Sequence, residues 1–500
     1  MASGSLAGTG TGTTAARAGS QIESIGHSVL ADRLGVLPGS DRVQDALSYL
    51  LAHIDAGAWS EGSERRQGRE PGAAVDRTRR LLDLLGNPER SLGIVHITGT
   101  NGKTSTAWLV SAMLRSAGLR VGTFTSPHLQ QVTERIAFNG EPVSEGELAQ
   151  ALLEVRAVAP GTSDGNPRFF EILSAAAIWH FARRGADVAV VEVGIGGRED
   201  ATNALDADVA VATNVGLDHV ELLGPTTVHI AGQKAGIIKQ GSIAIVGEVD
   251  EAVDGVFASA AEAVEARALL RWGRDFGASA LAGSSLGHEL AMFTPAARYE
   301  GLWSPLRGRH QDVNAGCALA AAEAFLGHPL GRECLQRALR EAELPGRLEV
   351  VGSDPVVLLD GVKNASGAYA AARALDEDFG SARGRVLVVG LLRGHDPEEI
   401  LLGLAADRAR AVVVCTPPTS RAMPVDQILA AVERIGGHGI DGGDVREAME
   451  MGISLAGPED IVLVTGSLYV VGAAREALAA EHVEPAAGAG IDPLAVENGR

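Results

Sequence analysis

Short runs of Val, Ile and Ala recur along the chain, and longer Ala- and Leu-rich stretches separate them. In chain order the runs read GIVHIT, RVGTFT, DVAVVEV, DVAVAT, SIAIVG, PVVLLDG, RVLVVGL, AVVVC and DIVLVTG. A strand that is apolar at successive positions has both faces buried, and an intervening helix lets two such strands lie parallel. The pattern therefore predicts an α/β fold with mainly parallel sheets that are covered on both faces by helices.

One segment interrupts this alternation and indicates where the chain divides. Residues 277–306 are rich in Gly and Ser, and a helical stretch and the turn LPGR at 344–347 follow them. A length of 500 residues allows about three ordinary domains or two larger ones. We expect a larger N-terminal domain over residues 23–343 and a smaller, Rossmann-like α/β domain over 344–482.

The two ends of the chain show no apolar periodicity. Residues 1–22 and 483–500 are mostly small or polar. Segments of this kind bury too little apolar surface to offset the entropy of ordering the chain. We therefore expect both tails to be disordered.

The charge balance and the cysteines narrow the class of partner. The chain has 43 Lys and Arg against 63 Asp and Glu, and this net charge of −20 argues against broad nucleic-acid binding and favours a small partner. Cys317, Cys334 and Cys415 form no C-x-x-C pair, so we expect core residues and no zinc or disulfide framework. No uncharged apolar run has the length of a membrane span, and the N-terminus lacks the order of a signal peptide. We expect a cytoplasmic protein without membrane contact.

The stretch HITGTNGKTSTAW, residues 96–108, has the order strand, glycine turn, Lys-Thr and helix. Backbone N–H groups of such a turn and the helix dipole converge on one spot, where a di- or triphosphate binds. Position 97 is Ile where the full G-x-x-x-x-G-K-[ST] pattern has Gly, so the loop is a shortened variant. The residues expected to hold the nucleotide phosphates are Gly99, Thr100, Asn101, Gly102, Lys103 and Thr104. The alternative is an ordinary strand–helix turn with an exposed lysine.

A bound nucleotide triphosphate needs a divalent cation held by oxygen ligands, usually a hydroxyl and a carboxylate at the end of a buried strand. Glu192 has this position in DVAVVEVGIGG, after four apolar residues. An acid there is costly unless it binds a cation or pairs, so we expect a metal ligand; the alternative is an acid in a salt bridge at a strand end. Ser126 and His219 also follow strand-like runs, where ligand-binding loops of open sheets lie.

These residues belong to a longer series of segments spread over most of the chain. In order, the series reads LLGNPERSLGIVHITGTNGKTS, TSPHLQQVTERIAFNGEPVS, VVEVGIGGREDATN, TNVGLDHVELLG, IAGQKAGIIKQG, GRHQDVNAG, LPGR, TPPTSRAMP and VTGSLYVVGAAREAL. The series resembles the folylpolyglutamate synthase/dihydrofolate synthase family of the Mur ligase superfamily. The resemblance implies an N-terminal P-loop ATPase domain, a C-terminal glutamate-ligase domain and a monomer.

The resemblance also implies a reaction. Family members transfer the ATP γ-phosphate to a substrate carboxylate, and the amine of L-glutamate attacks the acyl phosphate. The expected substrates are dihydropteroate or folate, L-glutamate and ATP. Lys103 would hold the phosphates, Ser126 and Glu192 would bind a first Mg²⁺, and His219 would bind a second. Lys234 matches a lysine that the family carries as a carbamate, although a lone lysine in such a helix is otherwise read as a solvated side chain.

Further site residues follow from matching the family motifs. Asn314, Arg347 and Asp360 match the far wall of the ATP site, so the site would be split between the two domains and would close on substrate. Residues expected on the pterin side are Thr125, Pro127, His128 and Arg135, with Asp200 in the matching neighbourhood.

The chain departs from the family in DGVKNASG, where Lys363 and Ala365 replace the usual His and Pro. Lys363 does not accept a hydrogen bond as an imidazole does, but it can pair with phosphate. Two alternatives to a folate ligase stay open, and this change motivates the first of them. One is a paralogue with the same chemistry and another acid substrate. The other is a P-loop switch that hydrolyses nucleotide without making a product.

Overall fold

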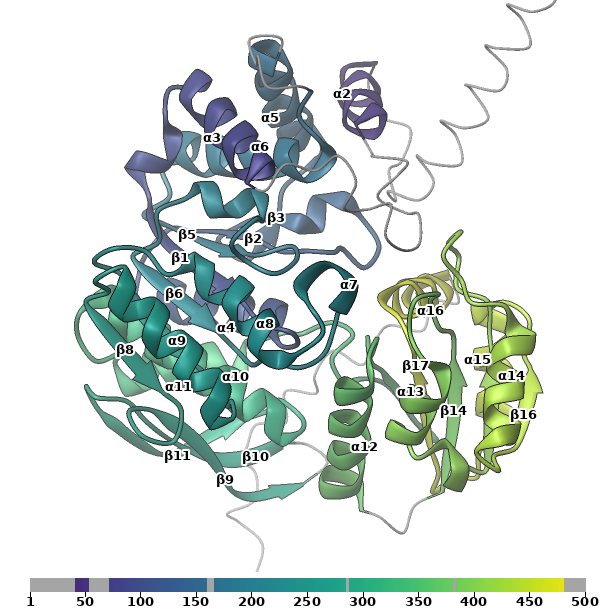
Figure 1. Cartoon of the computed structure of the whole chain (residues 1–500). Coiled ribbons are helices and arrows are strands. Elements are labelled where there is room, and N and C mark those ends of the chain that lie inside the picture. Colours follow the sequence, from purple (N-terminus) through teal and green to yellow (C-terminus); the bar gives the residue numbers. More distant parts are fainter. Residues whose placement is uncertain (1–40, 54–71, 160–165, 285–286, 381–383, 481–500) are drawn as a thin grey trace, which may run out of the picture.

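The computed structural model describes residues 41–53, 72–159, 166–284, 287–380 and 384–480 (Figure 1). Over these residues the chain forms two α/β units, each built on its own mainly parallel sheet. This architecture confirms the α/β fold class. The tails for which we expect disorder, 1–22 and 483–500, lie outside the described residues.

The larger sheet has eight strands in the order β4-β3-β2-β5-β1-β6-β7-β8. The strands are β1 Gly93–Thr98, β2 Val121–Phe124, β3 Ile136–Phe138, β4 Glu141–Pro142, β5 Val188–Glu192, β6 Val209–Ala212, β7 Ile243–Val246 and β8 Ala268–Arg271. The antiparallel pairs of this sheet are β2 with β3 and β3 with β4, at one edge. Because β2, β5, β1 and β6 are parallel neighbours, their carboxyl ends meet at one side of the sheet, where open α/β sheets bind ligands.

Helices cover both faces of this sheet, as its apolar strands predict. In β1, Ile94 packs into one core, while Val95 and Ile97 pack into the core on the opposite face. The helices of the first face are α2 Asp41–Ala52, α3 Ala73–Leu84, α5 Glu145–Val158 and α6 Phe169–Arg183. Near β6 and β7 the same face is covered by α8 Thr227–Lys234 and α9 Glu251–Ala263. The helices of the second face are α4 Lys103–Ser116, α10 Arg309–Leu326 and α11 Arg332–Arg340. No helix among the described residues is long and apolar enough to cross a bilayer.

The segment that interrupts the alternation forms a small antiparallel sheet. Its strands are β9 Gly277–Ser284, β10 Gly287–Phe293 and β11 Arg298–Ser304, in the order β11-β10-β9. Leu290, Met292 and Leu302 point into the core that α10 and α11 share with the large sheet. The segment is therefore part of the N-terminal unit and not a linker.

The C-terminal unit has a six-stranded sheet in the order β12-β13-β17-β14-β15-β16. The strands are β12 Glu349–Ser353, β13 Val356–Leu359, β14 Arg385–Val389, β15 Ala411–Val414, β16 Gly439–Asp441 and β17 Ile461–Thr465, and only β12 is antiparallel. One face packs on α12 Ala365–Phe379, α13 Pro397–Gly403 and α14 Val425–Arg434, the other on α15 Val445–Leu455 and α16 Leu468–Ala480. The four apolar runs predicted here are β13, β14, β15 and β17, and β12 and β16 add to them.

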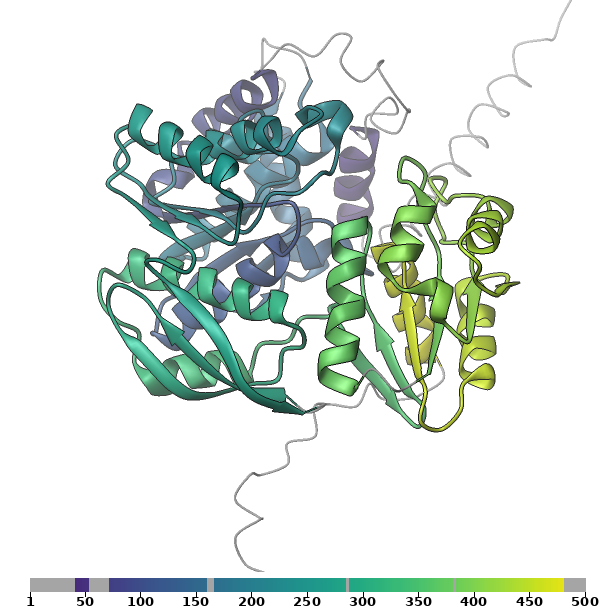
Figure 2. The same ribbon diagram turned by 60° about the horizontal axis from the view of Figure 1, so that its bottom comes forward.

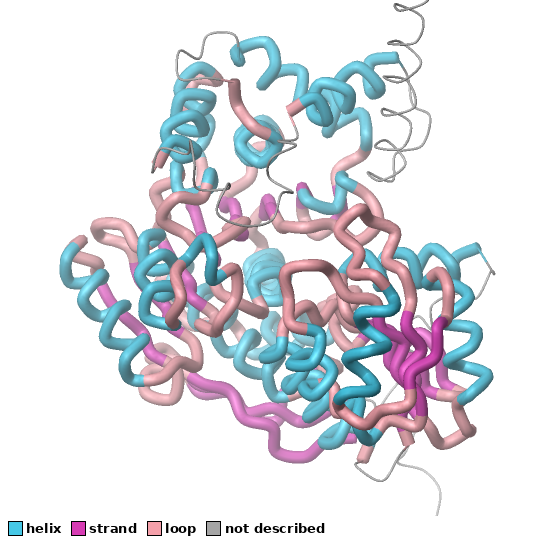
Figure 3. The backbone as a smooth tube through the Cα atoms, turned by 45° about the vertical axis from the view of Figure 1, so that its right-hand side comes forward, coloured by secondary structure: helices cyan, strands magenta, loops and turns pink. Residues whose placement is uncertain are grey.

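The two units meet along α12 and along the loop after β2. Figure 2 shows α12 on the side of the C-terminal unit that faces the N-terminal unit, and in Figure 3 the two groups of strands are separate with loops running between them. Gly308 donates its backbone N–H to Asp378 near the end of α12, at 2.9 Å. Leu129, from the loop after β2, packs against α16 in the C-terminal core. The turn at 344–347 joins the units, and there we place the domain boundary.

Candidate active site

The phosphate loop lies between β1 and α4, and two glycines make its path possible. Gly102 has φ +79°, a left-handed conformation that residues with a side chain rarely adopt. A Cβ at Gly102 would lie 2.3 Å from Oδ1 of Asn314, and a Cβ at Gly99 would lie 1.9 Å from Oγ1 of Thr213. The loop therefore packs against α10 on one side and against the end of β6 on the other.

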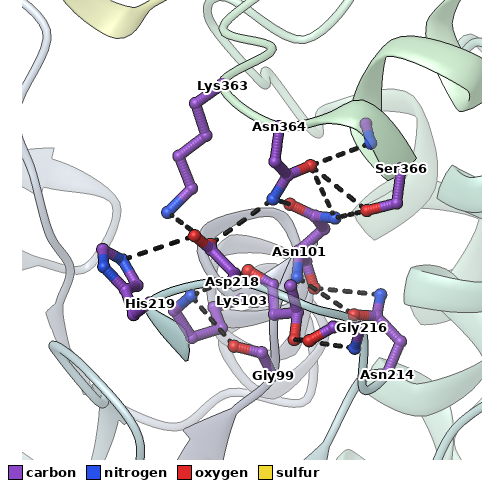
Figure 4. Close-up of polar contacts among 12 residues, drawn as sticks. Gly99, Asn101, Lys103, Asn214, Gly216, Asp218, His219, Lys363, Asn364 and Ser366 are labelled. Carbon is purple, nitrogen blue, oxygen red and sulfur yellow. Dashed lines mark hydrogen bonds and ion pairs between the residues drawn. The ribbon is translucent and has the colours of Figure 1, made fainter. Parts of the chain in front are cut away.

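The loop is fixed by the residues that follow β6. Asn214 Oδ1 accepts from the backbone N–H of Asn101 at 3.0 Å, and its amide donates to the Asn101 carbonyl at 3.1 Å. The Thr100 hydroxyl donates to the Gly216 carbonyl and accepts from the Gly216 N–H, at 3.1 and 2.9 Å. These bonds tie the loop to the segment after β6 and do not involve the side chain of Lys103 (Figure 4).

The side chain of Lys103 folds back over the loop. Its Nζ donates to the carbonyls of Gly99 and Thr100, at 3.1 and 3.3 Å. Burial and the nearby Lys363 lower the pKa of Lys103 to about 8, against the opposing effect of Glu192. The ammonium thus lies at the mouth of the turn, where Lys103 was expected to hold the terminal phosphates.

Three oxygen-bearing residues meet at the end of β5. Both carboxylate oxygens of Glu192 accept from the Thr104 hydroxyl, at 3.1 and 3.0 Å, and one accepts from the backbone N–H of Ser126 at 3.1 Å. Burial raises the pKa of Glu192, which is only 1% exposed, and Lys103 opposes that rise. A carboxylate with two neighbouring hydroxyl residues fits Mg²⁺, which takes few protein ligands and keeps places for phosphate oxygens and water.

His219 lies beside a carboxylate that our sequence reasoning did not select. Its Nε2 is 3.8 Å from Oδ1 of Asp218, and Oδ2 of Asp218 is 3.1 Å from Nζ of Lys363 in the C-terminal unit. Burial lowers the pKa of His219 to about 4 despite the opposing effect of Asp218, so the imidazole is neutral at pH 7 and able to bind a metal.

Lys234 ends α8 and is buried, with 3% of its surface exposed. Burial, with Lys103 and Lys363, holds the pKa of this amine well below its usual range. Among the residues that the structure describes, Lys234 has no hydrogen-bond or ion-pair partner. The solvated-lysine alternative does not fit this environment.

The predicted far wall is contributed by both units. Asn314 of α10 lies against Gly102, and its amide donates to Gln311 Oε1 at 3.0 Å. Asp360 follows β13 and accepts from the backbone N–H of Leu348 at 2.8 Å; burial raises its pKa to about 6, with Arg347 opposing. Arg347 donates to the Gly346 carbonyl at 2.9 Å.

The residues expected on the substrate side lie on the loop between β2 and β3. Arg135 donates from Nε to Nδ1 of His128 at 2.8 Å, and its guanidinium stacks over Phe169. Burial lowers the pKa of Arg135 to about 10. Thr125 donates its backbone N–H to the Arg135 carbonyl, and Pro127, between them, follows a cis peptide bond. These residues form one cluster beside Glu192.

Asp200 is placed differently from this cluster. Its carboxylate accepts from the backbone N–H groups of Ile195 and Thr202, each at 3.0 Å, and from the Thr202 hydroxyl. It shapes the glycine-rich loop after β5, and over the described residues it makes no hydrogen bond or ion pair with the phosphate loop. Its expected substrate role stays a prediction.

Four polar residues of the site escaped sequence reasoning: Asn214, Asp218, Asn364 and Ser366. Asn214 and Asp218 follow β6 within TNVGLDH, and their position after a buried strand was a usable signal. Asn364 and Ser366 begin α12, and their side chains reach the side chain of Asn101 across the domain boundary, at 3.1 and 2.9 Å. Which residue they meet depends on how the two units pack, and no local pattern encodes that.

Both units of the chain match domains of known proteins. Residues 97–322 match the Mur ligase middle domain, and residues 346–468 match the Mur ligase glutamate ligase domain. The chain is 34% identical to a dihydrofolate synthase/folylpolyglutamate synthase of Mycobacterium tuberculosis, over 88% of this chain and 95% of that protein.

A longer relative and a solved structure agree with this match. The chain is 36% identical to a probable bifunctional folylpolyglutamate synthase/dihydropteroate synthase of Haloferax volcanii over 82% of its own length, but it spans only 49% of that relative. The structure of Mycobacterium tuberculosis folylpolyglutamate synthase complexed with ADP superposes with a TM-score of 0.78 at 33% identity, covering 87% of this chain and 98% of that one.

Proposed function

Because the chain belongs to the folylpolyglutamate synthase/dihydrofolate synthase family of Mur ligases, we propose that it is an ATP-dependent ligase that joins L-glutamate to dihydropteroate, to reduced folates, or to both. The observation that carries this proposal is the contact of Thr104 with Glu192 at the mouth of the phosphate loop. It brings the loop, a carboxylate and a hydroxyl to the point where a cation and a γ-phosphate meet.

The reaction divides into two displacements. A carboxylate oxygen of the acid attacks the γ-phosphorus of ATP, the bond to the β-phosphate oxygen breaks, and ADP leaves. The amine of glutamate then attacks the carbonyl carbon of the acyl phosphate, an amine proton is lost, and phosphate leaves. Phosphorylation is needed because oxide is a very poor leaving group.

In this scheme the chain supplies position and charge. The rigid loop from Gly99 to Thr104 orients the phosphates, and Lys103 stabilises negative charge on the transferred group. Glu192, Thr104 and Ser126 would hold one Mg²⁺ and His219 would contribute to a second; the ions supply Lewis-acid stabilisation of the phosphoryl oxygens. Asn314, Arg347 and Asp360 bind the rest of the nucleotide between the two units. We infer that the protein acts as a monomer, since the units of one chain supply all these residues.

A product assay tests the substrate class. The purified protein receives ATP, Mg²⁺ and L-glutamate, with dihydropteroate in one reaction and tetrahydrofolate in the other, and the amide is detected by mass spectrometry. We expect product in at least one reaction, together with ADP. Absence of product from a folded, ATP-binding sample contradicts the folate assignment.

A different acid substrate is the second candidate, because Lys363 and Ala365 change the loop that begins α12. ATP turnover that depends on glutamate plus some other carboxylic acid supports that candidate. Turnover that needs no acceptor supports a nucleotide switch. The three outcomes are distinguished by which additions raise ADP release.

We further propose that Lys234 is carbamylated. A neutral amine adds to CO₂, losing one proton and becoming an anionic carbamate, and burial of Lys234 lowers the pKa of its amine, which favours the neutral form. With ¹³C-labelled bicarbonate, we expect a carbamate carbon resonance in the protein that is missing in Lys234→Arg. Lys239→Arg is the matched control, because Lys239 lies five residues away and donates to a backbone carbonyl. A signal that persists in Lys234→Arg contradicts the assignment.

A further inference from the structure

Lysine is used very sparingly in this chain, and the few lysines gather at the site. Of the 43 basic residues only four are lysines, namely Lys103, Lys234, Lys239 and Lys363. Each of the three other than Lys239 is near the phosphate loop. Lys363 acts on the charge of both Lys103 and Lys234, and for Lys103 it is the largest influence after burial.

The ion pair of Lys363 with Asp218 is unusual for this chain because its cation is a lysine. Elsewhere over the described ranges, ion pairs with acids use Arg or His, as between Arg309 and Glu248 or Arg77 and Glu171. Lys363 is the one lysine in an ion pair there, with 3.1 Å between Nζ and Asp218 Oδ2. An ammonium is a compact charge that moves between partners, whereas a guanidinium holds a carboxylate in a fixed fork. A purely structural tie therefore has no need of lysine in this chain.

The backbone at Lys363 is held over the phosphate loop. Asn364 caps α12 and donates from Nδ2 to Asn101 Oδ1 at 3.1 Å, and it lies 3.4 Å from Asp218 Oδ2. Ser366 accepts from the Asn101 amide at 2.9 Å. These contacts fix the start of α12, and Figure 4 shows the Lys363 side chain running from there to Asp218, beside Lys103.

Asp218 has the properties of a group that positions a charge. Its side chain is 5% exposed, while that of Lys363 is 37% exposed, so the protein encloses the carboxylate and leaves the lysine side chain partly open to solvent. Burial raises the pKa of Asp218, but Lys363 and His219 outweigh burial and bring it well below its usual range. Its Oδ1 is buried without a hydrogen bond among the described residues, and Nε2 of His219 lies 3.8 Å from it.

We propose that Lys363 is a second phosphate-contacting lysine, delivered by the C-terminal domain to the terminal phosphoryl group of ATP, and that Asp218 is the positioning residue that holds it there. The proposal rests on the proposed ATP site and deepens it. The contact forms only when both domains are in place, so it couples domain packing to recognition of the phosphoryl group that is transferred.

Nucleotide binding tests the proposal without any acid substrate. Calorimetry would measure the affinities of Mg·AMPPCP, which has a third phosphoryl group, and of Mg·ADP, which does not. A hydrogen bond to a charged group predicts that Lys363→Met weakens AMPPCP binding by roughly ten- to a hundredfold while ADP binding changes by less than about twofold. Lys239→Met, which removes a lysine that donates to the backbone carbonyl of Asn203, should change neither.

The role of Asp218 is tested by a double-mutant cycle. We expect Asp218→Asn to reduce the AMPPCP preference, and Asp218→Asn/Lys363→Met to be no worse than Lys363→Met alone, because the two residues act as one unit. Thermal unfolding of every variant separates loss of folding from loss of binding. An unchanged ratio of AMPPCP to ADP affinity in Lys363→Met overturns the phosphate contact, and additive effects overturn the positioning role.

These results are independent of the substrate assignment. If wild-type protein makes the glutamate product but Lys363→Met keeps the AMPPCP preference, this inference fails and the proposed function stands. If no folate product forms but the preference depends on Lys363, the substrate assignment fails and the inference stands.

Discussion

Lys103→Met is expected to lower the rate of ATP-dependent product formation by about a thousandfold, with the fold intact. The Lys103 ammonium lies at the mouth of the phosphate loop, where its positive charge would stabilise the negative charge of the transferred phosphoryl group. Loss of one such electrostatic contact has a large effect on the rate. The loop itself is held by Asn214 and by the contact of Thr100 with Gly216, so it should keep its path. Initial rates at saturating ATP, with circular dichroism of the variant, check this prediction.

Lys239→Met is the control for this variant. Lys239 also donates its ammonium to a backbone carbonyl, that of Asn203, which is not part of the phosphate loop. Its replacement should affect stability more than rate. A Lys103→Met protein with a wild-type rate would show that the phosphates bind elsewhere.

Glu192→Gln is expected to lower product formation on the order of a hundredfold or more and to raise the Mg²⁺ concentration needed for half-maximal rate. The amide retains the shape of the side chain and can still accept from Thr104 and Ser126, but it lacks the charge that binds the cation. Because burial disfavours the ionised carboxylate, this variant should unfold at the same or a higher temperature. Rates over a Mg²⁺ titration, with thermal unfolding, measure both effects.

Glu171→Gln provides the contrasting buried acid. Glu171 pairs with Arg77 between α6 and α3, away from the phosphate loop. Removing its charge leaves a buried guanidinium without its carboxylate, which should lower stability without changing the Mg²⁺ requirement. If Glu192→Gln behaves like Glu171→Gln, Glu192 is a structural acid and not a metal ligand.

The sequence predicted those parts of the fold whose residues are buried on both faces. The nine runs read from the sequence form β1, β2, β5, β6, β7, β13, β14, β15 and β17, and nearly every residue of these strands is buried. The strands that it did not predict lie at sheet edges or outside the two large sheets. β9 consists of Gly, Ala, Ser and Leu, and β16 has only three residues. Neither strand therefore carries a clear apolar–polar alternation or a continuous apolar run.

The residues of the candidate site likewise include some that local sequence predicts and some that it does not. The phosphate loop and Glu192 were predictable because a glycine turn between a strand and a helix, and an acid at the end of a buried strand, are unusual locally. Asp218 and Asn364 were not, because each is an ordinary loop or capping residue until the other domain is brought against it. Lys363 was noticed only as a departure from the family pattern, and its partner became clear from the structure.

The division of the site between two units has a consequence for the reaction cycle. The start of α12 contacts Asn101, and the loop after β2 reaches α16 through Leu129 and through Gln130, which accepts from Arg475 at 3.2 Å. The phosphate loop and the loop after β2 thus each touch the C-terminal unit. Substrate entry and product release are expected to require movement of one unit relative to the other.

The transfer of an oxygen atom tests the central claim most directly. Dihydropteroate, or the folate that serves as substrate, is prepared with ¹⁸O in the reacting carboxylate and incubated with the protein, ATP, Mg²⁺ and L-glutamate. If an acyl phosphate forms, one labelled oxygen leaves with phosphate, so the inorganic phosphate released should carry one ¹⁸O for each amide made. Phosphate without ¹⁸O alongside amide product would contradict carboxylate phosphorylation and with it the role assigned to the phosphate loop.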